Sequence, residues 1–238
     1  MIKINIMKVY KYTTKNKKLK IEPKIYNNLE FIKILINFSL LLLSEKEHEE
    51  ISIDELKFEK IYLINDKKNS FILCLFNNKY FIIKSPFRFL IRNKICKIYF
   101  NDKKEIKLTD IKILEYMIDI VEKYIIPKIN DNNVHILKKL SNSIRKFKME
   151  KEKDNVEYNL SDKYIEYIFI KLINFNFYYA RYDYDKKNAS DVHPLNHIDL
   201  GLENTIKLGL RDKIKPSDFI NFNLNKEFFY IEKVTTYE

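Results

Sequence analysis

The chain has 238 residues, of which 46% are hydrophobic and 14% aromatic, and this composition excludes a chain that is disordered throughout. Its formal net charge of +11 favours nucleic acid, an anionic surface or an acidic protein as a partner. Only five of the 44 basic residues are Arg, the side chain that reads guanine and phosphate through paired hydrogen bonds, so the charge favours non-specific phosphate contacts over sequence readout.

The two cysteines and the apolar runs bear on where the protein works. Cys74 and Cys96 have apolar neighbours and no CxxC spacing, which predicts buried free thiols in a reducing cytoplasm. The N-terminus lacks the apolar core of a signal peptide, and the most apolar run, residues 31–43, is too short for a membrane span. We therefore expect a cytoplasmic protein without a membrane partner.

The first half of the chain predicts one helix followed by a run of strands. Apolar residues at three- and four-residue steps predict a helix from Asn28 to about Glu49, with the acidic residues 45–50 as its exposed end and His48 on the surface. Short β-branched and aromatic runs then predict one antiparallel sheet, built from residues 61–64, 71–76, 80–83, 87–90, 95–100 and 105–108.

The second half predicts three helices and then a strand. The helices are expected from Thr109 to Ile125, from Val134 to about Lys153, and after Ser161. From Phe175 the apolar period changes to two, which indicates a strand with Arg181 on one face. The chain as a whole predicts an α+β fold: an antiparallel sheet or two, with packed helices, in a single domain 1–238. A division into halves 1–130 and 131–238 is an alternative.

The helix from Val134 to about Lys153 is the most basic in the chain. One interpretation is a helix that lies along a phosphate backbone, and the other is an ordinary solvated face in a Lys-rich protein. The first predicts a set of nucleic-acid-binding residues, to which a basic residue nearer the C-terminus is added: Lys138, Lys139, Arg145, Lys146 and Arg211.

A dense polar segment near the C-terminus holds two of the four histidines and lies beside the only two glycines. In an extended segment, His197 and Asp199 face the same side. An imidazole and a carboxylate placed in this way can share a divalent metal ion, or can act as a base and its orienting partner. If the neighbouring strand pairs with this one, further side chains join the same site, which gives a candidate catalytic set of His193, His197, Asp199, Arg181 and Asp183.

Three interpretations of this segment remain open from the residues alone. The histidines could hydrogen-bond a loop and have only a structural role. His197 and Asp199 could form a hydrolytic site, as base or metal ligands, with Arg181 or Arg211 holding a phosphate. The tyrosines and lysines around them could instead form a recognition surface that stacks on nucleotides without catalysis.

Three stretches of the chain resemble a bacterial family of unknown function. They are Arg181-Tyr-Asp-Tyr-Asp185, His193-Pro-Leu-Asn-His197-Ile-Asp199-Leu-Gly201 and Lys215-Pro-Ser-Asp-Phe-Ile220, followed by Phe228-Phe229. The family shows an R-[FY]-[DE]-[YP]-D strand, an HP-L-x-HLH-[IL]-G motif and a P-x-x-F-[IV] helix before an aromatic pair. The resemblance covers about the last 55 residues, and this chain has Asp199 where the family has a third His.

Members of this family sometimes lie beside mobile-element or phage-defence genes, so the resemblance implies a role with nucleic acid or in defence. Together with the basic charge, it predicts a nucleic-acid-associated defence or toxin-type protein, such as a nuclease or phosphodiesterase that uses the cluster from His193 to Asp199. The alternative is a non-enzymatic subunit of a defence complex that binds nucleic acid or a protein partner. Inactive protein with salt-sensitive binding would favour the alternative.

Overall fold

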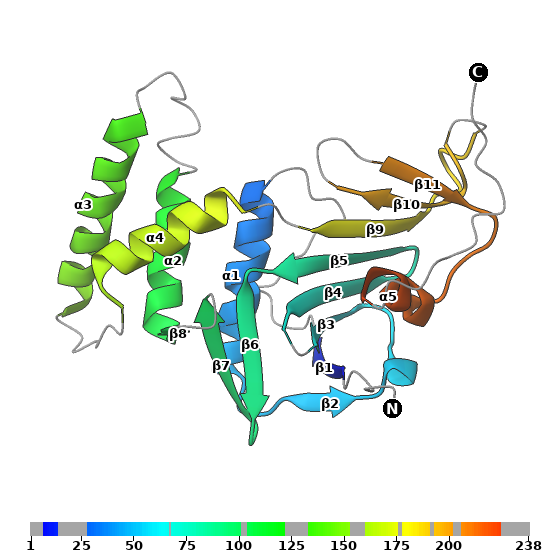
Figure 1. Ribbon diagram of the computed structural model, residues 1–238, viewed down its shortest axis with the longest axis horizontal. Helices are drawn as coiled ribbons and strands as arrows, with labels where there is room; N and C mark the ends of the chain where they lie inside the picture. Colours follow the sequence, from blue (N-terminus) through cyan, green and yellow to red (C-terminus); the bar gives the residue numbers. More distant parts are fainter. Residues whose placement is uncertain are drawn as a thin grey trace. The chain divides into compact units, whose positions relative to one another are not determined.

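The structure is a computed structural model that describes residues 7–13, 28–66, 68–100, 104–121, 133–152, 160–175, 178–190, 193–201 and 206–224. Its helices and antiparallel strands form an α+β fold, as the sequence predicts (Figure 1). The chain divides into two compact units. The first comprises Met1–Asn27, His48–Ser85 and Phe177–Glu238, and the second comprises Asn28–Glu47 and Pro86–Asn176.

These units differ from the halves 1–130 and 131–238 considered from the sequence. The reason is strand pairing, because β5 (Lys79–Ser85) and β9 (Tyr179–Tyr184) lie about one hundred residues apart in the chain and are neighbours in one sheet. A boundary at residue 130 would separate these two strands. The second unit is therefore formed by two segments, Asn28–Glu47 and Pro86–Asn176, each inserted between parts of the first unit.

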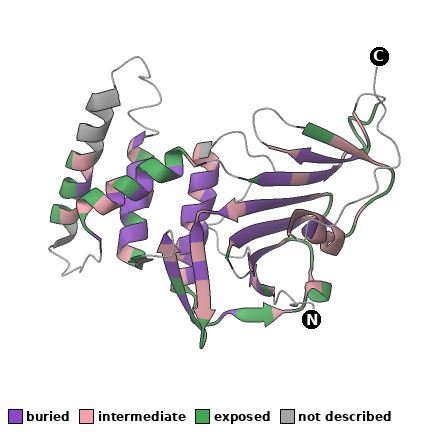
Figure 2. Ribbon diagram, in the orientation of Figure 1, coloured by how far each residue is buried: buried purple, intermediate pink, exposed green. Residues whose placement is uncertain are grey.

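The first unit is built on an eight-stranded antiparallel sheet with the order β11-β10-β9-β5-β4-β3-β1-β2. Its other strands are β1 (Lys8–Thr13), β2 (Glu49–Ile51), β3 (Lys60–Asn65), β4 (Ser70–Phe76), β10 (Asn196–Leu200) and β11 (Ile206–Leu210). A single-turn helix, η1 (Ile53–Glu55), follows β2. Figure 2 shows that the central strands are largely buried.

One face of this sheet packs against α5 (Pro216–Leu224). Alternate residues on the strands point to this face, and they form a buried apolar cluster with Phe219 and Ile220 of the helix. Tyr80 and Tyr182 stack at its centre with their ring centroids 4.8 Å apart. The strand residues between these positions, among them Arg181, consequently point to the opposite face.

The acidic run at residues 45–50 is not the end of a helix, in contrast to the expectation from the sequence. Helix α1 (Asn28–Ser44) ends earlier, and Glu49 and Glu50 belong to β2. Their carboxylates pair with Lys11 and Lys8 on β1, at 3.0 and 2.9 Å. Cross-strand charge pairs favour the strand over a longer helix.

The expectation that His48 is a surface residue is also wrong. His48 is buried, and its Nδ1 lies 2.8 Å from the Tyr12 hydroxyl in a hydrogen bond. The charges beside it in sequence point elsewhere, so its neighbours in the chain gave no sign of its environment.

The second unit combines a small sheet with helices. Its sheet has the order β6-β7-β8, and its helices pack on one another. The elements are α1, β6 (Phe87–Arg92), β7 (Ile95–Phe100), β8 (Lys104–Ile106), α2 (Leu108–Ile120), α3 (Asn133–Glu152) and α4 (Asp162–Ile173).

The strands after residue 85 do not extend the first sheet, in contrast to the single sheet predicted from sequence. The free edge of β5 is occupied by β9, and Pro86 has no backbone N–H to continue a ladder. Asn93 and Lys94, both with positive φ, then make the tight turn that folds β6 onto β7.

Within the described residues, no helix is long and apolar enough to cross a membrane.

Cys74 and Cys96 are both free and buried, which confirms the sequence-based expectation. Burial raises the pKa of the Cys96 thiol to about 12 and that of Cys74 well above its ordinary value, so both thiols are protonated at neutral pH.

We predict that a thiol reagent labels the native protein slowly and gives two equivalents after unfolding. Rapid labelling of both cysteines in the native protein would contradict this.

Candidate functional site

Four charged or polar side chains meet on the sheet face opposite α5. Arg181 and Asp183 are on β9, and His197 and Asp199 are on β10. The antiparallel register sets Asp183 opposite His197 and Arg181 opposite Asp199. Because all four positions have the same parity along their strands, their side chains point to the same face.

Two lysines on the flanking strands complete the cluster. Lys79 on β5 lies opposite Asp183, and Lys207 on β11 lies opposite Asp199. The Lys79 ammonium is 3.4 Å from Asp183 Oδ1, and the Lys207 ammonium is 3.2 Å from Asp199 Oδ1. Four adjacent strands therefore contribute to one site.

Arg181 joins the two carboxylates. One terminal nitrogen of its guanidinium donates a hydrogen bond to Asp199 Oδ2 at 2.5 Å. Its Nε forms an ion pair with Asp183 Oδ2 at 2.8 Å, but the angle at this contact is not that of a hydrogen bond. Both carboxylates are buried, with residue exposures of 4% for Asp183 and 2% for Asp199. Buried carboxylates need such partners, because an unpaired charge in this position is costly.

The site carries more positive than negative charge. Three cationic side chains, Lys79, Arg181 and Lys207, surround two carboxylates. The lysine side chains are about one-third exposed, whereas the carboxylates lie deeper. An anion that approaches this face would meet the lysines first.

His197 is held in a defined orientation. Its Nδ1 lies 2.8 Å from the carbonyl oxygen of Pro194, which can only accept, so Nδ1 carries the proton in this hydrogen bond. Burial lowers the pKa of His197, which keeps the ring neutral at neutral pH. Its Nε2 then presents a lone pair toward Asp183 Oδ2 at 3.7 Å and Asp199 Oδ2 at 3.8 Å.

The loop between β9 and β10 places His193 over His197. Their ring centroids are 4.7 Å apart in an edge-on arrangement, and backbone hydrogen bonds with Ser190 hold His193 in place. Asp185 starts this loop and accepts hydrogen bonds from Asn188, which are the main cause that lowers the Asp185 pKa to about 2. Its Oδ2 lies 3.6 Å from His193 Nε2.

The two glycines fit this geometry. Gly209 lies opposite His197 on β11, and a Cβ at this position would come within 3.0 Å of Pro194 Cγ. Its missing side chain therefore lets Pro194 lie close to the sheet and present its carbonyl to His197. Gly201 directly follows β10 and has a φ of 85°, a conformation that other residues rarely adopt.

The structure brings together all five residues of the candidate catalytic set: His193, His197, Asp199, Arg181 and Asp183. It also adds Lys79 and Lys207, which sequence reasoning missed. Lys79 lies far away in the chain and becomes a neighbour only through the β5–β9 pairing. The sequence offered only a weak indication of Lys207, which lies two residues before Gly209 and therefore on the same face of a strand.

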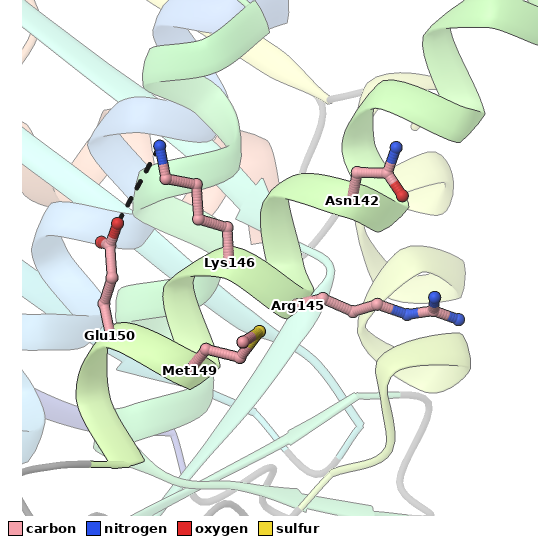
Figure 3. A pocket seen from close by; sticks show the side chains of 5 residues that line it. All are labelled: Asn142, Arg145, Lys146, Met149 and Glu150. Atoms are coloured by element: carbon pink, nitrogen blue, oxygen red, sulfur yellow. Dashed lines mark ion pairs between the residues drawn. The ribbon is translucent and has the colours of Figure 1, made fainter.

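The proposed nucleic-acid-binding residues fall on both units. On α3, Arg145 and Lys146 are exposed, and they line a surface hollow with Asn142, Met149 and Glu150 (Figure 3). Lys146 pairs weakly with Glu150, at 4.0 Å. The side chains of Lys138 and Lys139 lie outside the described residues. Arg211 is exposed just after β11 in the first unit.

Comparisons with protein-family models, with curated proteins and with solved structures find no match to this chain. The function is therefore inferred from the geometry of the site.

Gly209→Ala tests how the site is built. We predict that the added methyl group displaces Pro194 and costs about 1–3 kcal/mol of unfolding free energy, the usual effect of overpacking. The His197 ring should move with Pro194, so its NMR signals should shift. Gly201→Ala is the matched control, since strain at its positive φ should lower stability without moving the His197 ring. Unchanged His197 signals in Gly209→Ala would contradict this account.

Proposed function

We propose that this protein hydrolyses phosphodiester bonds in nucleic acid through the cluster of Asp183, His197 and Asp199. One observation carries this proposal: two buried carboxylates and a buried imidazole lie on one sheet face with three cationic side chains around them. Phosphodiester hydrolysis needs both kinds of group, because the phosphate is an anion and the attacking water must lose a proton.

The cationic groups suit the phosphate. Lys79 and Lys207 are partly exposed and lie on either side of the buried carboxylates, so each ammonium group could contact a phosphate of a bound strand. Arg181 adds a guanidinium, a group that can bind two phosphate oxygens at once. Point charges of this kind attract the backbone without reading the bases, in agreement with the low Arg content of the chain.

The buried groups suit the activation of water. The Nε2 lone pair of His197 and the two Oδ2 atoms converge, and they can act on a water molecule either as a base or as ligands of a cation. In either case the water oxygen forms the new bond to phosphorus and the bond to the ester oxygen breaks, and the proton that the water gives up is delivered to the leaving ester oxygen. His193 is half-buried beside His197 and is close enough to take part in this transfer.

The biological setting of the proposal comes from the resemblance to the bacterial family. It supports a nucleic-acid-associated bacterial defence or toxin-type role, in which a hydrolase with little sequence preference is useful. The net charge of +11 supports the same class of substrate.

Activity of His197→Gln on labelled DNA and RNA oligonucleotides tests this proposal. Gln retains a polar side chain of similar size but offers no imidazole base or ligand. We predict a loss of at least about 100-fold in hydrolysis for His197→Gln and Asp199→Asn, in the range that removal of an acid–base group produces. Asp212→Asn, a substitution of an exposed carboxylate after β11, is the matched control and should leave activity unchanged. Wild-type protein without activity on either substrate, across divalent cations, would contradict the proposal.

A second candidate function is supported by the ion pairs themselves. Each buried carboxylate already has two cationic partners, which is also what a purely structural cluster requires. The protein would then be a non-enzymatic subunit that binds nucleic acid or a protein partner, with α3 as its basic surface. The exposed Arg145 and Lys146 on this helix favour that alternative.

Charge removal on α3 tests this second candidate. We predict that replacing Lys138, Lys139, Arg145 and Lys146 with Gln weakens binding about equally for unrelated DNA sequences. The slope of log K against log salt should also become shallower, by about 0.9 for each phosphate that the helix no longer neutralises. A salt slope identical to that of the wild-type protein would assign this helix surface to ordinary solvation.

A further inference from the structure

Three potential ligand atoms converge below the surface of the first sheet. One nitrogen of His197 and one carboxylate oxygen each from Asp183 and Asp199 lie within 4.8 Å of one another, and all three residues are buried. From these residues we infer a divalent metal site, with His197 Nε2 and the two carboxylates as its ligands. The use of the ion rests on the proposed hydrolytic function, whereas the site itself is inferred from the geometry of its residues alone.

The distances are close to those of a metal centre. Zinc ligands lie about 2.1 Å from the ion, and in a tetrahedron this places neighbouring ligand atoms about 3.4 Å apart. The distances from His197 Nε2 to the two Oδ2 atoms are 3.7 and 3.8 Å. All three ligand atoms lie within 4.8 Å of one another, so the carboxylates would move together by up to about 1.4 Å, the difference between 4.8 and 3.4 Å, to close around an ion.

The orientation of His197 is the one that metal ligands adopt. Histidine ligands usually donate their second ring N–H to a carbonyl or carboxylate, which fixes the tautomer and directs the lone pair at the ion. His197 makes this bond from Nδ1 to the Pro194 carbonyl oxygen at 2.8 Å. Gly209 permits the close approach of Pro194, so the sheet itself supports the ligand.

Within the described part of the chain, each carboxylate also keeps one oxygen that receives no hydrogen bond. Asp183 Oδ1 and Asp199 Oδ1 are buried atoms without a hydrogen-bond partner among the described residues. Their nearest cations, the lysine ammonium groups, lie at 3.4 and 3.2 Å without hydrogen-bond geometry. Carboxylates that are buried this deeply usually receive full hydrogen bonds or bind a metal.

Arg181 occupies the position where a metal would bind. Its guanidinium contacts both Oδ2 atoms, so Arg181 and a divalent ion compete for the same oxygens. Its side chain is 19% exposed, which gives it a way out toward solvent when an ion enters. When the ion replaces Arg181 at these oxygens, the Arg181 guanidinium would lie free beside the ion, where it can bind the phosphate of a substrate.

The mixture of ligands indicates which ions fit. Imidazole suits Zn²⁺ and other transition metals, and carboxylates suit Mn²⁺, so a set of one nitrogen and two oxygens favours Mn²⁺ or Zn²⁺ over Ca²⁺. Once bound, such an ion lowers the pKa of a water molecule in its open position and so supplies a nucleophile for hydrolysis.

Calorimetric titration of the EDTA-treated protein with MnCl₂ and with ZnCl₂ tests the inference. We expect one equivalent of at least one ion to bind. His197→Gln, Asp183→Asn and Asp199→Asn should each weaken its affinity by at least about 10-fold, as loss of a supporting group already does. Asp212→Asn should bind as the wild-type protein does. Absence of saturable binding of both ions, or equal affinity in Asp199→Asn and Asp212→Asn, would overturn the inference.

Arg181→Gln provides a test that a structural cluster would fail. Removing the competing guanidinium should tighten metal binding about 10-fold or more, and the ion should restore the melting temperature that the variant loses. Weaker binding in Arg181→Gln would overturn the proposed competition. If this variant does not fold without metal, its recovery on refolding with and without MnCl₂ or ZnCl₂ gives the same comparison, and equal recovery would count against the site.

The titration separates this inference from the proposed function, because it contains no nucleic acid. Metal binding without hydrolysis of any oligonucleotide would support the site and refute the hydrolase. Hydrolysis that persists in EDTA, by protein that binds neither ion, would refute the site and support a metal-free hydrolase.

Discussion

The guanidinium of Arg181 lies between two buried carboxylates, and the arrangement of the first unit around it follows from that contact. Asp183 and Asp199 are nearly inaccessible to solvent, and removing one partner from a buried ion pair typically costs about 3–5 kcal/mol. The contact requires β9 and β10 to pair in one register, since a slip of one residue would turn Arg181 toward the apolar face that packs on α5. Charge pairing and apolar burial therefore select the same register.

The local features and the pairing of consecutive strands could be predicted from the sequence, whereas the pairings between distant strands could not. The alternation around Arg181 and the helical periods are local, so the strand β9, the helices and the α+β class could be predicted. Which distant strands become neighbours depends on contacts between distant segments, and for this reason the separation of β6, β7 and β8 from the first sheet, the burial of His48 and the contribution of Lys79 were not foreseen. The candidate catalytic residues could be chosen because their motif lies within about twenty residues.

The site combines features of two kinds of cluster. Its ion pairs satisfy buried charge, which any stable sheet needs. The orientation of His197 is harder to explain by stability alone, because its lone pair faces two carboxylates, where only a proton or another cation is favourable. This unusual placement, supported by Pro194 and Gly209, is the reason to assign chemistry to the cluster. The exposed basic residues of α3 belong to the other unit and are not part of this cluster.

The protonation of the His197 ring tests this account most directly. Long-range ¹H–¹⁵N NMR spectra of histidine-labelled protein distinguish a protonated ring nitrogen from one with a lone pair. The account predicts a proton on Nδ1, a lone pair on Nε2, and a large shift of Nε2 when ZnCl₂ is added to the EDTA-treated protein. A proton on Nε2 that remains there in the presence of ZnCl₂ would mean that His197 donates a hydrogen bond to the carboxylates, and the cluster would then be structural.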